Sequence, residues 1–411
     1  MMRVIRTVIK ILVVLALFAV AGIAGLLGLL WLDHTRETTL PTPTGPFAVG
    51  RTTYVWSDAV HTDPLAPQPG SKRELLAWIW YPAASRQPNQ MFDDYLPAPW
   101  RTALERQSGV LFSHFLTRDL SRISTHSVRD AEVSPQHRSY SVVFMRAGLA
   151  ALTTDYTALA EDLASHGYVV VGFDAPYRSF VAVFPDGRVI ARAPQNNVDL
   201  VGGPQAEQLA NRLVQAWSAD MSFALDQLEQ LNTSAPSGRF LGRLDMQRVG
   251  VLGHSLGGAT ALQFCHDDSR CKAGIDVDGA PLGSVIAEGV TQPFMFLLSD
   301  HRGETADADT PEAIRQAGAN IRSIYDRLPG DRRWWITVRG ANHYMFGDGA
   351  MLKSPPAMRV MRSFGIVHLD GRRQVAVTEH YIGSFFDVYL QGAPASTLQS
   401  QPEYPEIEYV H

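Results

Sequence analysis

A serine flanked by glycines, between a short apolar run and a helical pattern, is the feature that most constrains the fold of this chain. The stretch reads Arg248-Val249-Gly250-Val251-Leu252-Gly253-His254-Ser255-Leu256-Gly257-Gly258, so Gly-x-Ser-x-Gly follows a strand and opens a helix. So sharp a turn has a crowded backbone that needs small residues on either side, and it exposes the serine hydroxyl at the edge of a sheet. The helix N-terminus behind Ser255 favours developing negative charge. The pattern therefore predicts a nucleophilic Ser255; the alternative is a glycine-rich turn that only packs helix against strand.

The other apolar runs fit a parallel sheet with helices on both faces. They do not alternate with polar residues, as expected for strands that are buried on both sides. Strands are predicted at residues 75–81, 141–145, 168–173, 248–252, 273–277, 293–298 and 334–338. Helical patterns lie at residues 206–231, 256–266, 311–327 and 381–389, and residues 184–188 read as a hairpin turn. The βαβα order predicts an α/β protein with one main sheet.

A serine hydroxyl is a weak nucleophile near neutral pH, so Ser255 needs a general base. In the α/β fold that carries this kind of turn, the histidine comes last, on a loop after the final strand. His343 fits this position, because it closely follows the strand predicted at residues 334–338. His368 and His380 are rivals, but the first lies beyond a loop with two prolines and the second begins the last helix.

The acid that orients the imidazole is less constrained by the sequence. Asp278 closes the strand predicted at residues 273–277. Asp300 closes the next strand, at residues 293–298, which is the position that many α/β-hydrolases use. Sequence order alone permits either aspartate, and a capping or turn role is the alternative for each.

An oxyanion hole needs two backbone N–H groups close to the nucleophile. One is expected from Leu256, directly after the serine, and the other from the loop after the strand that ends at residue 145. That loop reads Ala147-Gly148-Leu149, so the N–H of Leu149 is the second candidate. The alternative is an ordinary strand-to-helix loop.

The N-terminal segment predicts a membrane-spanning helix. Residues 11–32 form a run of 22 uncharged, mostly apolar residues, which as a helix is about 33 Å long and spans a hydrocarbon core of about 30 Å. The basic flank at residues 1–10, with Arg3, Arg6 and Lys10, should stay in the cytoplasm and send the body to the outer, periplasmic or extracellular side. The alternative is a signal peptide that is cleaved near Ala19-Val20-Ala21, which leaves a secreted protein.

The rest of the chain divides into three expected parts. Prolines at high density predict an extended linker over residues 33–45. A catalytic domain is expected over residues 46–393 and a polar, proline-bearing tail over residues 394–411. Cys265 and Cys271 lie six positions apart and could pair outside the cytoplasm; two buried thiols are the alternative.

Composition excludes several classes of function. The formal net charge of −5 gives no basic excess for binding nucleic acid. No His-Glu-x-x-His or Cys-x-x-Cys spacing occurs, so we expect no metal and no cofactor. The expected partners are a small ester or phospholipid substrate and the membrane, while the oligomeric state is left open.

These residues together resemble the α/β-hydrolases of the plasma-type (isoform II) platelet-activating factor acetylhydrolase family and its bacterial lipase-like relatives. The shared motifs, within residues 46–393, include Trp80-Tyr81-Pro82, Thr154-Asp155-Tyr156, Leu163-Ala164-Ser165-His166-Gly167-Tyr168, Gly253-His254-Ser255-Leu256-Gly257-Gly258-Ala259-Thr260 and Gly274-Ile275-Asp276-Val277-Asp278-Gly279. The resemblance implies an α/β-hydrolase fold with Ser255 as nucleophile and His343 as base, and it favours Asp278 over Asp300 as the acid. It also implies hydrolysis of short or oxidised acyl esters, often on phospholipids, without a metal ion.

Two departures from the family pattern bear on substrate preference. The family's oxyanion loop usually reads Ser-His-Gly-Leu or Ser-Pro-Gly-Leu, whereas this chain has Arg146-Ala147-Gly148-Leu149. Ala175 stands where the family often has histidine. We expect a membrane-anchored serine esterase; the alternatives are a broad carboxylesterase or polyester-type hydrolase without phospholipid preference, and a catalytically dead scaffold used for binding.

Overall fold

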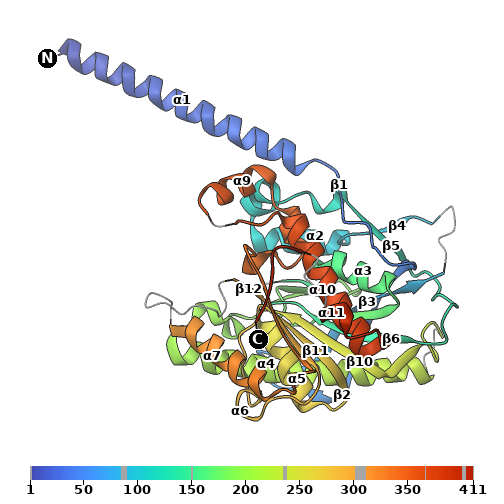
Figure 1. Ribbon diagram of the computed structural model, residues 1–411. Coiled ribbons are helices and arrows are strands. Elements are labelled where there is room, and N and C mark those ends of the chain that lie inside the picture. Colours follow the sequence, from blue (N-terminus) through green and yellow to red (C-terminus); the bar gives the residue numbers. More distant parts are fainter. Residues whose placement is uncertain are drawn as a thin grey trace.

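The computed structural model describes residues 2–84, 90–149, 151–234, 238–300, 312–365, 367–399 and 404–410. One long helix projects from a body that is built around a single large sheet (Figure 1). The strands are β1 (Thr38–Thr39), β2 (Ala48–Thr62), β3 (Lys72–Ala83), β4 (Phe92–Asp94), β5 (Ile123–Arg129), β6 (Tyr140–Arg146), β7 (Tyr168–Asp174), β8 (Val181–Val183), β9 (Val189–Ala191), β10 (Leu244–His254), β11 (Cys271–Val277), β12 (Phe294–Ser299), β13 (Arg333–Val338) and β14 (Ile407–Tyr409). The α-helices are α1 (Met2–His34), α2 (Ala98–Ser108), α3 (Thr157–Ser165), α4 (Gly203–Ser234), α5 (Leu256–Asp267), α6 (Val285–Glu288), α7 (Glu312–Arg327), α8 (Gly349–Leu352), α9 (Pro355–Ser363), α10 (Gly371–Gln391) and α11 (Ser396–Gln399).

The central sheet is parallel in its middle and mixed at its sides, where β1 and β2 each pair with β5 in parallel. Its strands follow the order β1-β5-β2-β3-β7-β6-β10-β11-β12-β13-β14, with β4 paired to β5. The six strands from β7 to β13 in this order run parallel, whereas β2, β3 and β14 make antiparallel pairs. The carboxyl ends of the parallel strands therefore meet at one edge of the sheet. The separate hairpin of β8 and β9 forms at the predicted turn.

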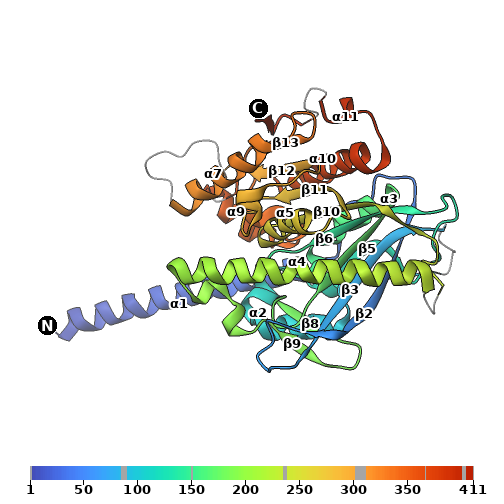
Figure 2. The same cartoon turned by 90° about the horizontal axis from the view of Figure 1, so that it is seen from below.

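Helices cover both faces of the sheet, with α3 and α10 on one face and α4, α5 and α7 on the other (Figure 2). Alternate residues of β6 show the consequence: Val143 and Met145 pack in one core, while Val142 and Phe144 pack in the other. Because both sets are buried, β6 reads as an unbroken apolar run. The predicted fold class, a mostly parallel sheet with helices on both faces, is confirmed.

The body extends beyond both predicted domain boundaries. The expected linker over residues 33–45 is extended, but β1 within it pairs with β5 and Leu40 is buried in the core. Within the expected tail over residues 394–411, β14 adds an antiparallel edge strand next to β13. A three-residue edge strand is too short to show the alternating pattern by which strands are predicted.

Helix α1 leaves most of its apolar side chains exposed and contacts the body at its C-terminal end. Among the described residues it is the one helix long and apolar enough to cross a membrane. Asp33 forms an ion pair with Arg118 at 3.1 Å, and Nδ1–H of His34 donates to the carbonyl oxygen of Thr117 at 2.9 Å. Trp31 lies 6.2 Å from Phe115, between ring centroids. These contacts hold the end of α1 against a π-helical turn over Phe112–Leu116.

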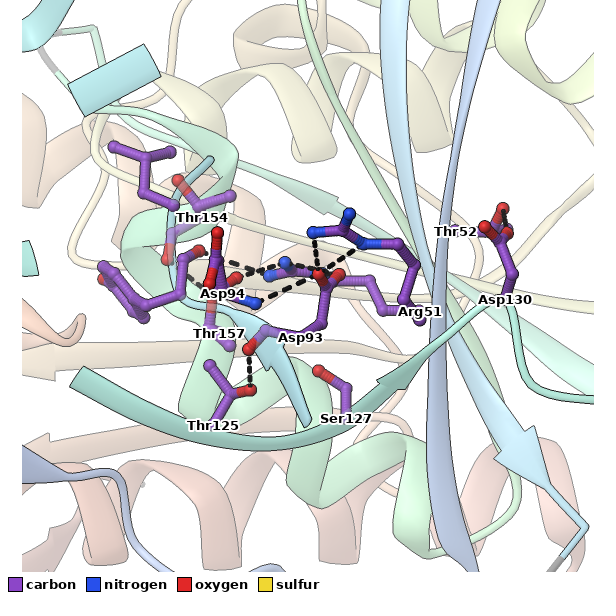
Figure 3. Close-up of polar contacts among 12 residues, drawn as sticks. Arg51, Thr52, Asp93, Asp94, Thr125, Ser127, Asp130, Thr154 and Thr157 are labelled. Atoms are coloured by element: carbon purple, nitrogen blue, oxygen red, sulfur yellow. Dashed lines mark hydrogen bonds and ion pairs between the residues drawn. The ribbon is translucent and has the colours of Figure 1, made fainter. Parts of the chain in front are cut away.

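A charged cluster around Asp93 fastens β4 to the edge of the sheet (Figure 3). One carboxylate oxygen of Asp93 accepts from Nε of Arg51 at 2.8 Å, and the other accepts from Nε of Arg129 at 2.6 Å. The backbone carbonyl of Asp93 accepts from the hydroxyl of Thr125 at 2.6 Å. Arg51 on β2 is 1 % exposed, so its charge depends on this carboxylate for compensation.

Candidate active site

Ser255 occupies the turn between β10 and α5 in a strained backbone conformation, with φ of 59° and ψ of −124°. Positive φ is uncommon for a residue with a side chain and persists where the surrounding structure enforces it. The flanking glycines explain how the turn closes. A Cβ on Gly253 would lie 2.0 Å from the carbonyl oxygen of Gly257, and a Cβ on Gly257 would lie 2.3 Å from the carbonyl oxygen of Arg146. The small residues predicted around Ser255 are therefore required sterically.

His343 lies within hydrogen-bond distance of both Ser255 and Asp278. It begins a 3₁₀ turn over His343–Met345, soon after β13 ends. Its Nε2 is 3.0 Å from Oγ of Ser255, and its Nδ1 is 2.6 Å from Oδ2 of Asp278. Because a carboxylate only accepts, Nδ1 of the neutral imidazole carries the proton and Nε2 is left to accept from the serine hydroxyl.

Asp278 follows β11 and is fully buried. Its carboxylate also accepts from the backbone N–H of Ser299 at 2.9 Å and from the Ser299 hydroxyl at 2.9 and 3.0 Å. Asp300, the other aspartate left open by sequence order, is exposed and accepts from the N–H of Gly340 at 2.7 Å. Of the two candidate acids, the structure thus brings Asp278 to the imidazole.

The two rival histidines lie in other surroundings. His368 is exposed. His380 lies on α10, where its ring centroid is 5.3 Å from that of Tyr404. The hydrogen bond to Ser255 is made by His343.

The loop after β6 reaches the serine turn, as expected for an oxyanion loop. A Cβ on Gly148 would lie 3.3 Å from Cβ of Ser255, so the loop backbone runs directly beside the nucleophile. The side chains of Leu149 and Leu256 both pack against one apolar cluster that contains Trp217. The two residues predicted to supply the N–H groups thus pack against the same apolar cluster.

Arg146, at the end of β6, was missed by sequence reasoning as part of this site. It is 2 % exposed, and its guanidinium carbon lies 3.9 Å from the ring centroid of Trp217 and 4.9 Å from that of Phe173. Nη1 donates to the carbonyl oxygen of Phe173 at 3.0 Å. Burial lowers the pKa of Arg146 to about 10. The sequence signal was a lone cation that ends an apolar strand immediately before the loop.

Asp174, at the end of β7, lies near Arg146 and is also buried. It accepts from Nε1–H of Trp78 at 3.0 Å and from the N–H of Thr153 at 3.2 Å. Burial raises the pKa of Asp174 to about 7. Ala175, which stands where the family resemblance suggests histidine, is buried and donates its N–H to Oγ of Ser179 at 2.9 Å.

Cys265 at the end of α5 and Cys271 at the start of β11 are joined by a disulfide. Among the residues that the structure describes, no group of three or more histidine, cysteine, aspartate or glutamate side chains is arranged to hold a metal ion. The side chains that contact one another at this site are a serine hydroxyl, an imidazole and a carboxylate.

Comparison with known proteins relates this chain to a family of acetylhydrolases. Residues 33–380 match the family described as platelet-activating factor acetylhydrolase, isoform II. Platelet-activating factor acetylhydrolase of Canis lupus familiaris is 28% identical over 226 residues, which are 51% of this chain and 48% of that protein. The match thus spans about half the length of this relative. A probable 1-alkyl-2-acetylglycerophosphocholine esterase of Arthroderma benhamiae is 23% identical over 278 residues, 62% of each chain.

A solved structure resembles almost the whole chain. Ferulic acid esterase from Streptomyces cinnamoneus has a TM-score of 0.71 and 27% sequence identity, and the match covers 92% of this chain and all of that one. The family resemblance predicted from the sequence is confirmed, because the family match extends over most of the chain. This protein belongs to the platelet-activating factor acetylhydrolase isoform II family.

Proposed function

We propose that this chain is a membrane-anchored carboxylic-ester hydrolase that uses Ser255, His343 and Asp278 in an acyl-enzyme mechanism. The observation that carries the proposal is the hydrogen-bonded series from Ser255 to His343 and on to Asp278, at 3.0 and 2.6 Å. A serine in contact with an imidazole that a buried carboxylate orients has the arrangement needed for attack on an acyl carbon. The names of the curated relatives, acetylhydrolase and esterase, support the same chemistry.

The reaction proceeds in two acyl-transfer steps. Oγ of Ser255 attacks the ester carbonyl carbon while Nε2 of His343 takes the hydroxyl proton, and the N–H groups of Leu149 and Leu256 bind the oxyanion. His343 then gives its proton to the departing alkoxide as the acyl–oxygen bond breaks. Water repeats the sequence on the acyl-enzyme, which releases the acid and restores the serine. Loss of one oxyanion donor typically raises the barrier by about 3 kcal/mol.

The substrate class that we propose is esters with short acyl groups, including phospholipids. The support is the family membership and the apolar cluster beside the nucleophile, where Leu149 and Leu256 pack near Trp217. This wall favours an acyl chain over a polar group. A broad carboxylesterase or polyester-type hydrolase is the second candidate, and the likeness to a ferulic acid esterase favours it.

We further propose that α1 anchors the enzyme with its body on the outer side of the membrane. Residues 11–32 are mostly apolar and, apart from Leu30, exposed, and Arg3, Arg6 and Lys10 precede them. Next to the body end of α1, Val110, Leu111 and Phe112 are exposed as well, so this face of the body is suited to lie against lipid. A signal peptide cleaved within α1 is the alternative. The catalytic unit that follows comprises residues 33–410 rather than 46–393, because β1 and β14 belong to the sheet.

A fluorophosphonate probe tests the chemistry. Covalent labelling of the wild type and none of Ser255→Ala is the expected result. A wild type that is not labelled, or equal labelling of Ser255→Ala, contradicts the esterase proposal and leaves the binding scaffold. Hydrolysis of a series of p-nitrophenyl esters and short-chain phospholipids then separates the two esterase candidates: comparable rates on long simple esters and no phospholipid activity favour the broad carboxylesterase.

Membrane fractionation tests the anchor. The full chain should remain in the pellet after alkaline carbonate extraction and should keep an N-terminal epitope tag. A soluble protein that has lost the tag identifies cleavage instead. Digestion of intact cells by an external protease, after permeabilisation of any outer membrane, should reach the body but not the tag; the reverse pattern contradicts the proposed orientation.

A further inference from the structure

We propose that Tyr156 and His254 are positioning residues that join the oxyanion loop to the backbone of the catalytic histidine. The inference rests on the proposed esterase function. It concerns how the oxyanion loop and the loop that carries His343 are held relative to each other. Both side chains are buried, at 5 % and 8 % exposure. Their effect on the chemistry passes through Gly148 and His343.

The contacts form a continuous series. The Tyr156 hydroxyl lies 2.7 Å from Nδ1 of His254, and Nε2 of His254 lies 2.8 Å from the carbonyl oxygen of His343. The rings of His254 and His343 also lie against each other, with 4.8 Å between centroids. The residue before the nucleophile therefore holds the backbone from which the general base projects.

Tyr156 touches the loops on both sides of Ser255. A Cβ on Gly148 would lie 3.4 Å from Nδ1 of His254, so the oxyanion loop packs against the same hydrogen bond. A Cβ on Gly347, in the loop after His343, would lie 3.1 Å from the Tyr156 ring. Ala147 contributes only a methyl group to the oxyanion loop. Tyr156 therefore contributes to the support of both loops at this point.

The direction of the hydrogen bonds follows from what each group can do. The carbonyl oxygen of His343 only accepts, so Nε2 of His254 carries a proton. Nδ1 of neutral His254 then offers a lone pair, to which the Tyr156 hydroxyl donates. Burial raises the pKa of Tyr156, with the N–H of Gly148 acting in the opposite direction, so the phenol keeps the proton it donates. If either side chain is removed, a buried polar group of the remaining one loses this hydrogen bond.

Such support acts on the transition state more than on the ground state. Oxyanion donors and a general base must be held close to their productive positions, and a displacement of about 1 Å costs up to about 100-fold in rate. Substrate that binds along the apolar wall is less affected. We therefore expect loss of the series to lower kcat about 10- to 100-fold with little change in KM.

The experiment measures kcat, KM and thermal unfolding of the full chain in detergent with p-nitrophenyl acetate. The variants are Tyr156→Phe, His254→Leu and their combination, with His254→Gln as the conservative change because an amide offers one donor and one acceptor. Tyr168→Phe is the matched control: its hydroxyl donates to Asp387 at 2.7 Å, from the opposite end of the parallel strands.

The expected result is a lower kcat at constant KM for Tyr156→Phe and for His254→Leu. The double variant should be no slower than the slower single variant, His254→Gln should recover part of the rate, and Tyr168→Phe should keep the wild-type kcat. Wild-type kcat in Tyr156→Phe, multiplicative losses in the double variant, or an equal loss in Tyr168→Phe overturns the inference. Should Tyr156→Phe fail to fold, the comparison of His254→Leu with His254→Gln decides: equal kcat values overturn it.

Failure of the proposed function and failure of this inference can be distinguished. A wild type that neither hydrolyses the ester nor reacts with fluorophosphonate overturns the proposed function, and this inference with it. An active wild type with an unaffected Tyr156→Phe overturns the inference alone.

Discussion

Oγ of Ser255 lies 3.0 Å from Nε2 of His343, although 88 residues separate the two along the chain. The sheet explains the meeting, because β10 precedes the serine, β13 precedes the histidine, and both strands run parallel in one sheet with β11 and β12 between them. Both residues therefore emerge at the carboxyl edge. Asp278 follows β11, the strand next to β10, which places a carboxylate behind the imidazole.

Asp278→Asn is expected to lower kcat about 10⁴-fold, because an amide no longer holds the imidazole in the required tautomer. Asp300→Asn is the matched control: it follows the next strand, and its contact is with the backbone of Gly340. Ester hydrolysis by the two variants, compared with wild type, measures the difference. Equal losses, or the larger loss in Asp300→Asn, would return the acid role to Asp300.

Much of this arrangement could be predicted because its causes are local. The parallel strands are buried on both faces, so each is an unbroken apolar run, and the crowded turn at Ser255 demands glycines that are visible in the sequence. The choice between Asp278 and Asp300 could not be made from sequence order, because each aspartate follows a strand. The two differ in the path that the backbone takes after the strand. Asp278 leaves β11 with φ of 54° and meets donors from Ser299.

Other features depend on partners that are distant in sequence. Arg146 is compatible with a buried position because Phe173 and Trp217 lie against its guanidinium group. The sequence around residue 146 does not indicate that these two rings lie nearby. Strand β14 exists only because β13 offers it an edge. Residues 33–45 were expected to be a tether on account of their prolines, yet prolines are compatible with an extended segment that packs on the body.

Gly257→Ala is expected to destabilise the fold by about 2 kcal/mol and to lower activity, because the added Cβ would lie 2.3 Å from a backbone oxygen of Arg146. Urea unfolding and ester hydrolysis measure the two effects. Gly383→Ala is the control: it lies in α10 with nothing within 4 Å of an added Cβ. It should stabilise the protein by up to about 1 kcal/mol, since alanine is the better helix former. Gly257→Ala with the stability of wild type would contradict the steric account.

Asp174→Asn should flatten the pH dependence of stability between about pH 4 and 7. Burial raises the pKa of Asp174 from 3.8 to about 7 in the folded chain, so folding favours the protonated carboxyl. Its stabilising contribution is complete below about pH 4 and is lost as the pH rises through about 7. Asparagine stays uncharged throughout. In Asp174→Asn, the free energy of unfolding in urea, measured from pH 4 to 8, should fall less steeply than in wild type. The control Asp199→Asn, at an exposed position, should keep the wild-type slope. Identical slopes for wild type and Asp174→Asn would refute this.

Reduction of the disulfide between Cys265 and Cys271 is expected to lower the free energy of unfolding by about 2 kcal/mol, because the link closes a short loop in the unfolded chain. The bond joins the end of α5 to the start of β11, and both cysteines are 1 % exposed. Urea unfolding with and without dithiothreitol measures the change. The Cys265→Ala/Cys271→Ala variant should not respond to the reductant, and an equal response in both proteins would assign the effect to something other than this bond.

Arg178→Met is expected to destabilise the fold by about 3 to 5 kcal/mol, because it leaves buried Asp63 without its cation and leaves buried Asp220 with Arg73 alone. Nε of Arg178 donates to Asp220 at 2.7 Å, and Nη1 donates to Asp63 at 2.7 and 2.8 Å, with all three side chains almost fully buried. Arg188→Met is the matched control, because its partner Glu74 and the arginine itself are partly exposed. It should cost less than about 1 kcal/mol.

The pH dependence of the same two variants separates loss of charge compensation from loss of packing. Burial raises the pKa of Asp220, and protonation of Asp220 removes a charge that has lost one of its cations, so the deficit of Arg178→Met relative to wild type in urea unfolding should shrink as the pH falls toward about 4. A packing defect has no such dependence. A deficit that stays constant across this range would show that the arginine acts through the volume of its side chain instead of its charge.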